Sequence, residues 1–375
     1  MRHIGVEVAA SEIRVVEVSH IDENGYAVIS RLAREPLPDG AVLAGRIKNH
    51  AQVGFALKAA IRAARVPRYG FVIGLGTPDI SVSRVNMPSL VEKDEREGVL
   101  RATEADLNPS VRVGEAAIAT YMVDDNPYVD ESEQEINATY VRQSDLEDLL
   151  GVCDLAKLEP RAVDLSSTAL LRALQRVQNG DNAVSTLVDV GATKTTIITR
   201  AGMHMRSVRM LTQGGVEITR AIAASRGESF SSAERSKYDI VPSTMARKIV
   251  KQEAFGSEVE VEVASLNAVD PGVLAVGREL AKLVENIALA VESDSITFAT
   301  YTAGITLSGR GSLQKGLKEA LEVRTGVPVA VGMPWASIER TTRNAEYLVD
   351  GAPDPMLLLS LATVVGLAIW PGDEK

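Results

Sequence analysis

Two short stretches of the sequence place an acidic residue just before a turn of small residues. The acid and the three turn residues are Glu7, Ala9, Ala10 and Ser11 in the first stretch and, 182 positions later, Asp189, Gly191, Ala192 and Thr193 in the second. Such a turn directs several backbone N–H groups and one hydroxyl into a single concavity, which suits phosphate oxygens. The carboxylate before it can hold the hydration shell of Mg²⁺, an ion that keeps several waters when bound to proteins. The sequence therefore predicts two phosphate-binding turns and two carboxylates that hold magnesium through water.

A third stretch, LSGRGSLQKGLKEAL at residues 307–321, places Gly309 and Gly311 between a predicted strand and an amphipathic helix. Glycines at this point let the backbone pass close to a nucleoside, with the N-terminus of the helix behind it. The same pattern is also typical of an ordinary strand-to-helix turn. Taken alone, the stretch supports both interpretations equally.

The elements that would position these residues are predicted twice along the chain. The first set consists of strands at 3–8, 13–20 and 26–33, a hairpin turn at Asn24-Gly25 and a helix at about 50–65. The second set consists of strands at 186–191, 195–199 and 204–211 and helices at 214–225 and 278–292. Meandering strands followed by alternating helices and strands occur twice in the sequence. This repeat predicts two α/β domains with mixed sheets.

Length and charge limit the classes of function. With 375 residues, the chain is too long for one ordinary core and predicts two domains. The net charge of −10 argues against nucleic acid or an anionic membrane surface as the main partner. The first residues contain no apolar stretch of the kind found in signal peptides. The apolar run at 356–370 has 15 residues, fewer than the ~20 that span a bilayer, so we expect a soluble cytoplasmic protein.

Three further features have structural explanations. Asp354 and Pro355 precede the apolar run at 356–370 and predict the capped start of a buried helix. Cys153 is the single cysteine and lies among leucines, which favours a packed helix over a reactive thiol. The stretch 124–135 has six carboxylates and no basic residue, but it lacks the spacing of a calcium loop. We interpret it as a solvated loop, with a metal-binding loop as the alternative.

In their order and spacing, these motifs resemble the actin-like ATPase superfamily and, within it, the PilM family of type IV pilus assembly. The resemblance covers nearly the whole chain. It rests on IGVEVAASEIRVVEV (4–18), LVDVGATKTTIIT (187–199), LTQGGVEITRAIA (211–223), AERSK (233–237), LSGRGSLQKGLKEALEVRTGVPVAVGMPW (307–335) and LATVVGLAI (361–369). It implies that a nucleoside is approached by Gly214, Gly215, Glu234, Lys237, Gly309, Arg310, Gly311 and Ser312.

The resemblance implies an α/β actin-like fold of two duplicated ribonuclease-H-like domains. The expected bounds are 1–180 for the first domain with an inserted subdomain at about 88–165, 181–353 for the second with one at about 216–275, and 354–375 for a helix that returns to the first domain. The implied ligands are ATP or ADP with Mg²⁺. No residue is expected to be catalytic, and at most slow ATP hydrolysis is expected.

The implied function is that of a scaffold at the inner face of the cytoplasmic membrane. In the family, the cytoplasmic N-terminal peptide of the bitopic membrane protein PilN lies between the sheet of the first domain and its inserted subdomain, here within about residues 1–165. Other pilus platform and motor proteins are further candidate partners. Contact with the membrane is expected only through partners.

The first turn departs from the family pattern, which has glycine in place of Ala9 and more commonly aspartate in place of Glu7. If Ala9 has a positive φ, it costs about 1–2 kcal/mol, and its Cβ occupies space near the phosphates. Glu7 moves the carboxylate outward by about one C–C bond, ~1.5 Å. We therefore expect weaker phosphate contact at the first turn than at the second.

Two other functions of the same superfold remain open at this point. The first is a division filament similar to FtsA, although FtsA proteins end in a basic amphipathic helix and this sequence ends in LAIWPGDEK. The second is a small-molecule kinase, which needs a carboxylate base beside the transferred phosphate. No acidic residue apart from Glu7 and Asp189 has the expected position, and those two are assigned to magnesium.

Overall fold

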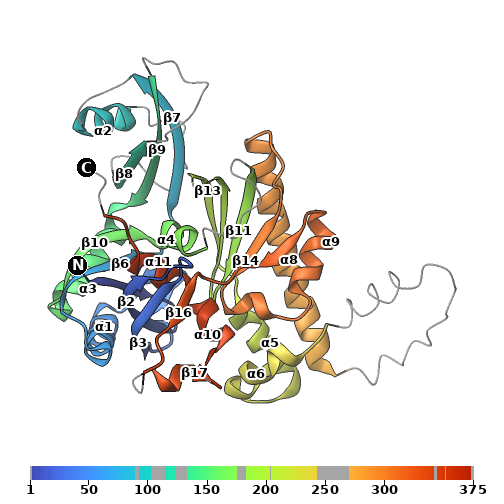
Figure 1. The fold of residues 1–375 in the computed structure, drawn as a ribbon. Coiled ribbons are helices and arrows are strands. Elements are labelled where there is room, and N and C mark those ends of the chain that lie inside the picture. Colours follow the sequence, from blue (N-terminus) through green and yellow to red (C-terminus); the bar gives the residue numbers. More distant parts are fainter. Residues whose placement is uncertain are drawn as a thin grey trace.

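The structure is a computed structural model. It describes residues 2–88, 93–102, 115–122, 133–174, 183–202, 204–242, 270–341, 344–350 and 352–372. Figure 1 shows two α/β domains side by side, with a smaller sheet beyond the first domain. Within these residues, no helix is both long and apolar enough to cross a membrane.

The first domain is built on a sheet in which six described strands have the order β10-β6-β1-β2-β3-β16. These strands are β1 (His3–Val8), β2 (Glu12–Ile21), β3 (Ala27–Pro36), β6 (Tyr69–Leu75), β10 (Glu159–Leu165) and β16 (Ala336–Ile338). β1, β2 and β3 form an antiparallel meander, whereas β6 is parallel to β1 and β10 is parallel to β6. The predicted Asn24-Gly25 turn is confirmed, since it joins β2 to β3 with Gly25 at φ 82°.

Helices cover both faces of this sheet. They are α1 (His50–Ala64), α3 (Gln143–Ala156), α4 (Ser166–Ala173), α10 (Pro355–Ser360) and α11 (Ala362–Ala368). α1 and α3 pack against one face, and α11 with α4 packs against the other, because neighbouring residues of β2 such as Val15 and Val16 are buried on opposite sides. The Asp354 carboxylate accepts a hydrogen bond from the Met356 N–H, which confirms the predicted capped start. The predicted apolar helix is buried and divides at Leu361.

The second domain is built on a sheet with the described strand order β13-β12-β11-β14-β15. Its strands are β11 (Val184–Val190), β12 (Thr195–Ala201), β13 (His204–Leu211), β14 (Ile305–Ser308) and β15 (Val329–Val331). Its helices are α5 (Gly215–Arg226), α6 (Phe230–Ser236), α8 (Pro271–Thr297) and α9 (Leu317–Thr325), with 3₁₀ turns η3 (Lys237–Asp239) and η5 (Arg310–Leu313). α8 and α9 bury an aliphatic core against the strands.

The two sheets repeat one topology. An antiparallel meander (β1-β2-β3 or β11-β12-β13) is extended from its first strand by parallel strands, β6 and β10 in one domain and β14 and β15 in the other. The predicted duplication of mixed sheets is therefore confirmed. β16 adds to the outer side of β3 in parallel, so the chain already rejoins the first sheet ahead of the expected 354–375 segment.

A smaller sheet lies beyond the first domain, with the described order β7-β9-β8, and Figure 1 shows α2 beside it. Its elements are β7 (Ile80–Pro88), α2 (Lys93–Ala102), β8 (Ala116–Met122) and β9 (Glu133–Arg142). The Asn137 side-chain amide donates a hydrogen bond to the Met205 carbonyl of β13 at 2.7 Å, so this sheet also contacts the second domain.

The remaining described elements are short, and part of the predicted organisation lies outside the described residues. The short elements are β4 (Val42–Leu43), β5 (Arg46–Ile47), β17 (Leu348–Val349), β18 (Ala352–Pro353) and η6 (Ala345–Tyr347). Residues 123–132, most of the acidic stretch, and residues 243–269 of the expected second subdomain are not described. The expected domain bounds stay a prediction.

Candidate functional site

The two predicted phosphate turns have the same backbone geometry. In the β1–β2 turn, the Ala9 N–H donates to the Glu12 carbonyl at 3.0 Å, and in the β11–β12 turn the Gly191 N–H donates to the Lys194 carbonyl at 2.9 Å. In both hairpins the acidic residue lies two positions before the donor. We call these the first hairpin (residues 7–14) and the second hairpin (residues 189–196).

The backbone at Ala9 shows no strain of the left-handed kind. Ala9 is not among the residues with positive φ, so the condition under which alanine would cost ~1–2 kcal/mol is not met. Gly191 has no positive φ either, although a Cβ there would lie 3.0 Å from the Lys194 carbonyl oxygen. Either residue therefore closes the turn, because the turn needs no left-handed residue.

Glu7 of the first hairpin is paired within its own domain. It stands opposite Arg14 in the β1–β2 register, and Arg14 Nη1 donates to Glu7 Oε2 at 3.0 Å. The same guanidinium donates to Glu12 Oε1 at 2.7 Å and to the Ser360 carbonyl at 2.7 Å. Burial lowers the pKa of Arg14, but the carboxylates of Glu7 and Glu12 outweigh it and raise that pKa overall. Arg14 is therefore a fixed cation.

Asp189 of the second hairpin is electrostatically coupled to the first domain. Burial, followed by the negative charge of Glu7, raises the pKa of Asp189 to about 6, while Lys194 and Arg14 act in the opposite direction. Since Glu7 and Asp189 belong to different domains, this electrostatic coupling acts across the junction of the domains. In the β11–β12 register Asp189 faces Thr196, so no cation stands opposite it as Arg14 stands opposite Glu7.

Lys194 links the two domains directly. Its ammonium donates to the Gly76 carbonyl, at the end of β6, at 3.1 Å. Burial lowers the pKa of Lys194, and the charges of Glu7 and Asp189 act against that shift. The two hairpins thus contribute three carboxylates and two cations to the site.

The 307–321 stretch packs against the second hairpin. β14 runs parallel to β11 with Ser308 beside Asp189, and η5 follows. Gly309 has φ +76°, and a Cβ there would lie 2.9 Å from Asp189 Oδ1. A Cβ on Gly311 would lie 2.4 Å from Val190 Cγ1. Glycine is required at both positions because the backbone of this turn touches the second hairpin.

The Gly214–Gly215 helix start also contacts the second hairpin. The N–H groups of Gly215 and Val216 donate to the carbonyls of Gly191 and Ala192 at 3.0 and 2.8 Å, and the Gly214 N–H donates to the Glu217 carboxylate at 2.9 Å. The first N–H groups of α5 are therefore used within the protein. The expected nucleoside contact of Gly214 and Gly215 stays a prediction.

Glu234 and Lys237 meet at the same helix start. Lys237 Nζ donates to Glu234 Oε2 at 2.7 Å, to Thr219 Oγ1 at 3.1 Å and to the Gly215 carbonyl at 3.3 Å. Burial lowers the pKa of Lys237, and Glu234 acts against the shift. The second hairpin, the α5 start, this pair and the turn at 309–312 thus form one continuous region.

Several buried polar atoms of this region lack a hydrogen-bond partner among the described residues. They include the donors of Thr193 (its hydroxyl) and Arg310 (Nε). A phosphate oxygen and a nucleoside are acceptors that suit these donors, so the residues fit a nucleotide. No group of three or more His, Cys, Asp or Glu side chains is placed to hold a metal in the described part of the chain. Magnesium bound through water by Glu7 and Asp189 stays a prediction.

The sequence was also compared with known protein families. The profile of the family described as "Type IV pilus assembly protein PilM" matches residues 5–369. The chain belongs to the PilM family.

Solved structures share the fold of this PilM-family chain. A structure titled "PilM-PilN type IV pilus biogenesis complex" has a TM-score of 0.72 and 22% identity and covers 98% of each chain. The ethanolamine utilization protein EutJ from Carboxydothermus hydrogenoformans has a TM-score of 0.50 and 14% identity, with coverage of 98% of this chain and 89% of that chain. MreB5 of Spiroplasma citri, bound to ADP, has a TM-score of 0.50 and 10% identity, with coverage of 98% and 95%. The predicted actin-like α/β fold is confirmed.

Two charged residues of this PilM-family site were missed from the sequence. Arg14 follows the first turn on β2, and Lys194 follows the second turn in the position that Glu12 has in the first hairpin. A signal was available, because aligning the two hairpins places opposite charges at this equivalent position. The tertiary structure was needed to show what each charge contacts.

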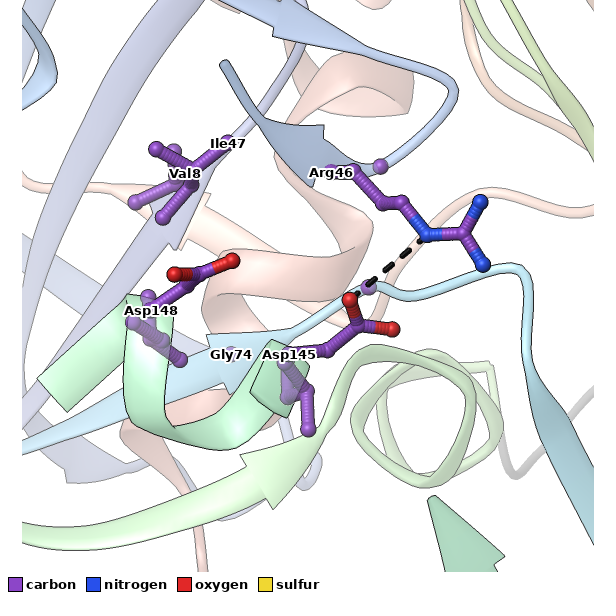
Figure 2. Close-up of a pocket in the computed structure, with 10 residues that line it drawn as sticks. Val8, Arg46, Ile47, Gly74, Asp145 and Asp148 are labelled. Atoms are coloured by element: carbon purple, nitrogen blue, oxygen red, sulfur yellow. Dashed lines mark ion pairs between the residues drawn. The ribbon is translucent and has the colours of Figure 1, made fainter. Parts of the chain in front are cut away.

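A pocket lies beside the first hairpin of this PilM-family chain, between the first sheet and α3 (Figure 2). It is open to solvent and is lined by Val8, Gly45, Arg46, Ile47, Gly74, Leu75, Gly76, Asp145, Asp148 and Leu149. Arg46 Nε lies 3.5 Å from Asp145 Oδ1, and Asp145 also accepts a hydrogen bond from Thr77. The Gly76 carbonyl that accepts from Lys194 belongs to this lining, so the pocket adjoins the junction of the two hairpins.

Cys153 is buried in α3, as the sequence predicted. Burial, followed by the charge of Asp154, raises the pKa of the Cys153 thiol to about 12. A thiol with such a pKa stays protonated at neutral pH and is a poor nucleophile. Cys153 is therefore part of the core of the first domain.

Proposed function

We propose that this chain is a nucleotide-binding actin-like scaffold of the type IV pilus assembly platform. Membership of the PilM family supports the pilus role. The observation that carries the nucleotide part is the coupling of Glu7 to Asp189 across the domain junction, with Lys194 reaching the first domain beside them. Two turns related by duplication and directed at one junction suit a polyphosphate held between two domains.

The nucleotide would be ATP or ADP. The second hairpin would supply backbone N–H groups and the Thr193 hydroxyl to phosphate, with Ala9, Ala10 and Ser11 opposite. The nucleoside would lie toward Arg310 and the Glu234–Lys237 pair. Support comes from the partnerless Thr193 hydroxyl and Arg310 Nε and from the contact of the turn at 309–312 with the second hairpin.

Turnover would be slow or absent, and the nucleotide would serve structure. A general base must be within hydrogen-bond reach of the proton it takes and must be free to accept it. Glu7 is already bound by Arg14, so it is not an unengaged base.

Calorimetric titration with ATP and ADP, beside a hydrolysis assay, tests the nucleotide site. We expect saturable binding and turnover far below the ~10 s⁻¹ typical of enzymes. Turnover near that value would contradict a structural role, and no binding of either nucleotide would contradict the site. Pelleting with nucleotide in the same series would reveal a filament of the FtsA type instead.

The partner we propose is the cytoplasmic N-terminal peptide of a PilN-like membrane protein. Support comes from the match with the PilM–PilN complex along 98% of both chains. The pocket beside the first hairpin opens between the first sheet and α3, and its apolar lining (Val8, Ile47, Leu75 and Leu149) suits the aliphatic side chains of a peptide. The peptide would bring the chain to the inner face of the cytoplasmic membrane.

Titration with a synthetic N-terminal peptide of the PilN-like protein tests the partner. We expect Ile47→Glu, at the pocket, to weaken peptide binding at least about tenfold, since it places a charge against apolar peptide side chains. Val323→Glu, on the exposed face of α9, is the matched control and should leave binding unchanged. Equal peptide binding by both variants would exclude this pocket. Recovery of the PilN-like protein from the membrane fraction, with and without ATP, tests the partner independently of the pocket.

A further inference from the structure

The position of Lys194 is unusual for a residue of a phosphate turn. Its side chain leaves the second hairpin and ends in the first domain, where Nζ donates to the Gly76 carbonyl at 3.1 Å. Two glycines provide the space for it. A Cβ on Gly76 would lie 2.8 Å from Nζ, and a Cβ on Gly45 would lie 3.4 Å from it and 1.8 Å from the Gly76 oxygen. The first domain thus has a space lined by Gly45 and Gly76 that accommodates the Lys194 ammonium.

In this glycine-lined space the ammonium is subject to the negative charge of both carboxylates that are assigned to magnesium. Glu7 and Asp189 each interact electrostatically with the Lys194 ammonium. An ammonium is a compact cation with three N–H donors, and among the described residues Lys194 uses one of them, toward Gly76. Two donors are left for a ligand at the junction of the hairpins.

Arg14, the other cation of the site, is in a different situation. Its guanidinium is bound by Glu7 and Glu12 and by the Ser360 carbonyl. Arg14 is therefore bound within its own domain. Lys194 lies between the domains, and two of its N–H donors have no partner among the described residues. Of the two cations, Lys194 is the one able to take a new anionic partner without losing an ion pair in its own hairpin.

We propose that the Lys194 ammonium is the resident cation of the phosphate site. It binds the terminal phosphate oxygens of the nucleotide between Glu7 and Asp189, in the place where a divalent ion would otherwise neutralise them. Binding of nucleotide should then depend only weakly on Mg²⁺. This inference rests on the proposed nucleotide-binding function and concerns which group supplies the positive charge.

The rival explanation is that Lys194 only joins the two domains through Gly76. Both explanations predict that removing the ammonium weakens nucleotide binding, because a loosened junction also binds less well. They differ in the effect of magnesium. A resident cation can be replaced by Mg²⁺, whereas a lost hydrogen bond to Gly76 cannot.

The experiment is calorimetric titration of the full chain with ATP, in excess Mg²⁺ and in EDTA. The variants are Lys194→Gln, which removes the charge, and Lys194→Arg, which keeps it. The control is Lys282→Gln, on α8, where Lys282 pairs with Glu279 at the exposed surface. Thermal unfolding without ligand establishes that each variant is folded.

For the natural chain we expect affinities in EDTA and Mg²⁺ within about tenfold of each other. Lys194→Gln should lose about 10- to 100-fold in EDTA, as for a charge-assisted hydrogen bond, and at most about threefold in Mg²⁺. Lys194→Arg should retain most of the EDTA affinity, and Lys282→Gln should behave as the natural chain.

Four results would overturn the proposal. Binding by the natural chain only in Mg²⁺, with Lys194→Gln unchanged, would refute the resident cation and leave the nucleotide site intact. An equal loss by Lys194→Gln in EDTA and Mg²⁺ would favour a purely structural link between the domains. If the natural chain binds no nucleotide in either condition, the proposed nucleotide function fails, and the role of Lys194 fails with it. If Lys194→Gln is unfolded, retention of EDTA binding by Lys194→Arg supports the proposal and its loss contradicts it.

Discussion

The two hairpins of this protein share a backbone and differ in where their cations come from. Both turns are closed by the same hydrogen bond, 3.0 Å in the first and 2.9 Å in the second. In the first hairpin, Arg14 stands directly opposite Glu7 on the neighbouring strand. In the second, Asp189 faces Thr196, and the cation Lys194 extends into the other domain.

This difference shows that two duplicated hairpins can have different electrostatic roles. The first hairpin is electrostatically complete within its domain, because Arg14 is paired with Glu7 and Glu12. The second hairpin is completed only by the first domain, because the Lys194 ammonium needs the Gly76 carbonyl. Of the two cations, only Lys194 donates a hydrogen bond to the other domain among the described residues, so substitutions in the two hairpins should have different effects.

The largest effect is expected from Arg14→Met, which breaks the first hairpin's ion pairs. The variant leaves the mostly buried Glu7 and Glu12 without this partner and should lose about 3–5 kcal/mol in the free energy of unfolding. Denaturant unfolding without ligand at neutral pH measures the loss. Arg324→Met is the matched control, because Arg324 also binds two carboxylates, Glu285 and Glu292, but at the exposed surface. A loss no larger than that of the control would show that the first hairpin does not depend on its cation.

The next largest effect is expected from Gly309→Ala, which pushes the 309–312 turn away from the second hairpin. The new Cβ would lie 2.6 Å from the Val190 carbonyl oxygen, at φ +76°. Strain and overpacking together should cost about 2–4 kcal/mol in unfolding free energy and weaken nucleotide binding. Gly326→Ala has a similar φ of +73° but no atom within 4 Å, so it should cost only the backbone strain, about 1–2 kcal/mol. Equal losses in both variants would mean that the contact with the second hairpin is unimportant.

Asp189→Asn tests the second hairpin through pH. Burial and then Glu7 raise the pKa of Asp189 from 3.8 to about 6, so the folded protein favours the neutral form. Protonated Asp189 therefore adds to the free energy of unfolding. This contribution is complete at pH values below the pKa of Asp189 in the unfolded chain, and it is lost as the pH rises through about 6, the pKa of Asp189 in the folded chain. Asparagine is neutral at every pH. The variant should therefore be more stable than the natural chain by about 2–3 kcal/mol at pH ~8, with little difference at pH ~4. Unfolding titrations across this range would contradict the coupling if the difference did not change with pH.

The smallest effects are expected from exchanging the residues that begin the two turns. Ala9→Gly should bring no gain in stability, because Ala9 has no positive φ, and should lose about 0.4–1 kcal/mol through the freer unfolded chain. Gly191→Ala places a Cβ 3.0 Å from the Lys194 carbonyl oxygen and should cost a similar amount. Thermal unfolding measures both, and calorimetry should show nucleotide affinity changed less than about threefold by Ala9→Gly. A large gain in affinity from Ala9→Gly would mean that the alanine does obstruct the phosphates.

Several features of the site could be predicted from residues close in sequence. The Asn24-Gly25 turn, the helix start at Asp354 and the small-residue turns follow from local preferences that hold in any surroundings. The duplication was also visible, because each copy repeats the same order of strands and turns. The sequence left open whether Ala9 is strained, since φ depends on the type of turn and the residue type alone does not fix it.

The contacts of Arg14 and Lys194 could not be predicted in this way. Arg14 binds a carbonyl 346 residues away, and Lys194 binds one 118 residues away. Such contacts depend on how α10 and the two domains pack together, which no periodic pattern encodes. Likewise, the N–H groups at the start of α5 could be expected to face a ligand, and in the structure they are bound by the second hairpin.

The sequence by itself indicated the family, through the order and spacing of its motifs. It also determined the duplicated α/β fold and the two acidic turns, because strand alternation, turn residues and helix caps act over a few neighbouring residues. Only the tertiary structure decided which charges meet. Glu7, Asp189 and Lys194 interact electrostatically because the two sheets pack together with their equivalent hairpins at one junction. The energy of that arrangement lies in contacts between distant residues, so it is set by packing of the whole chain.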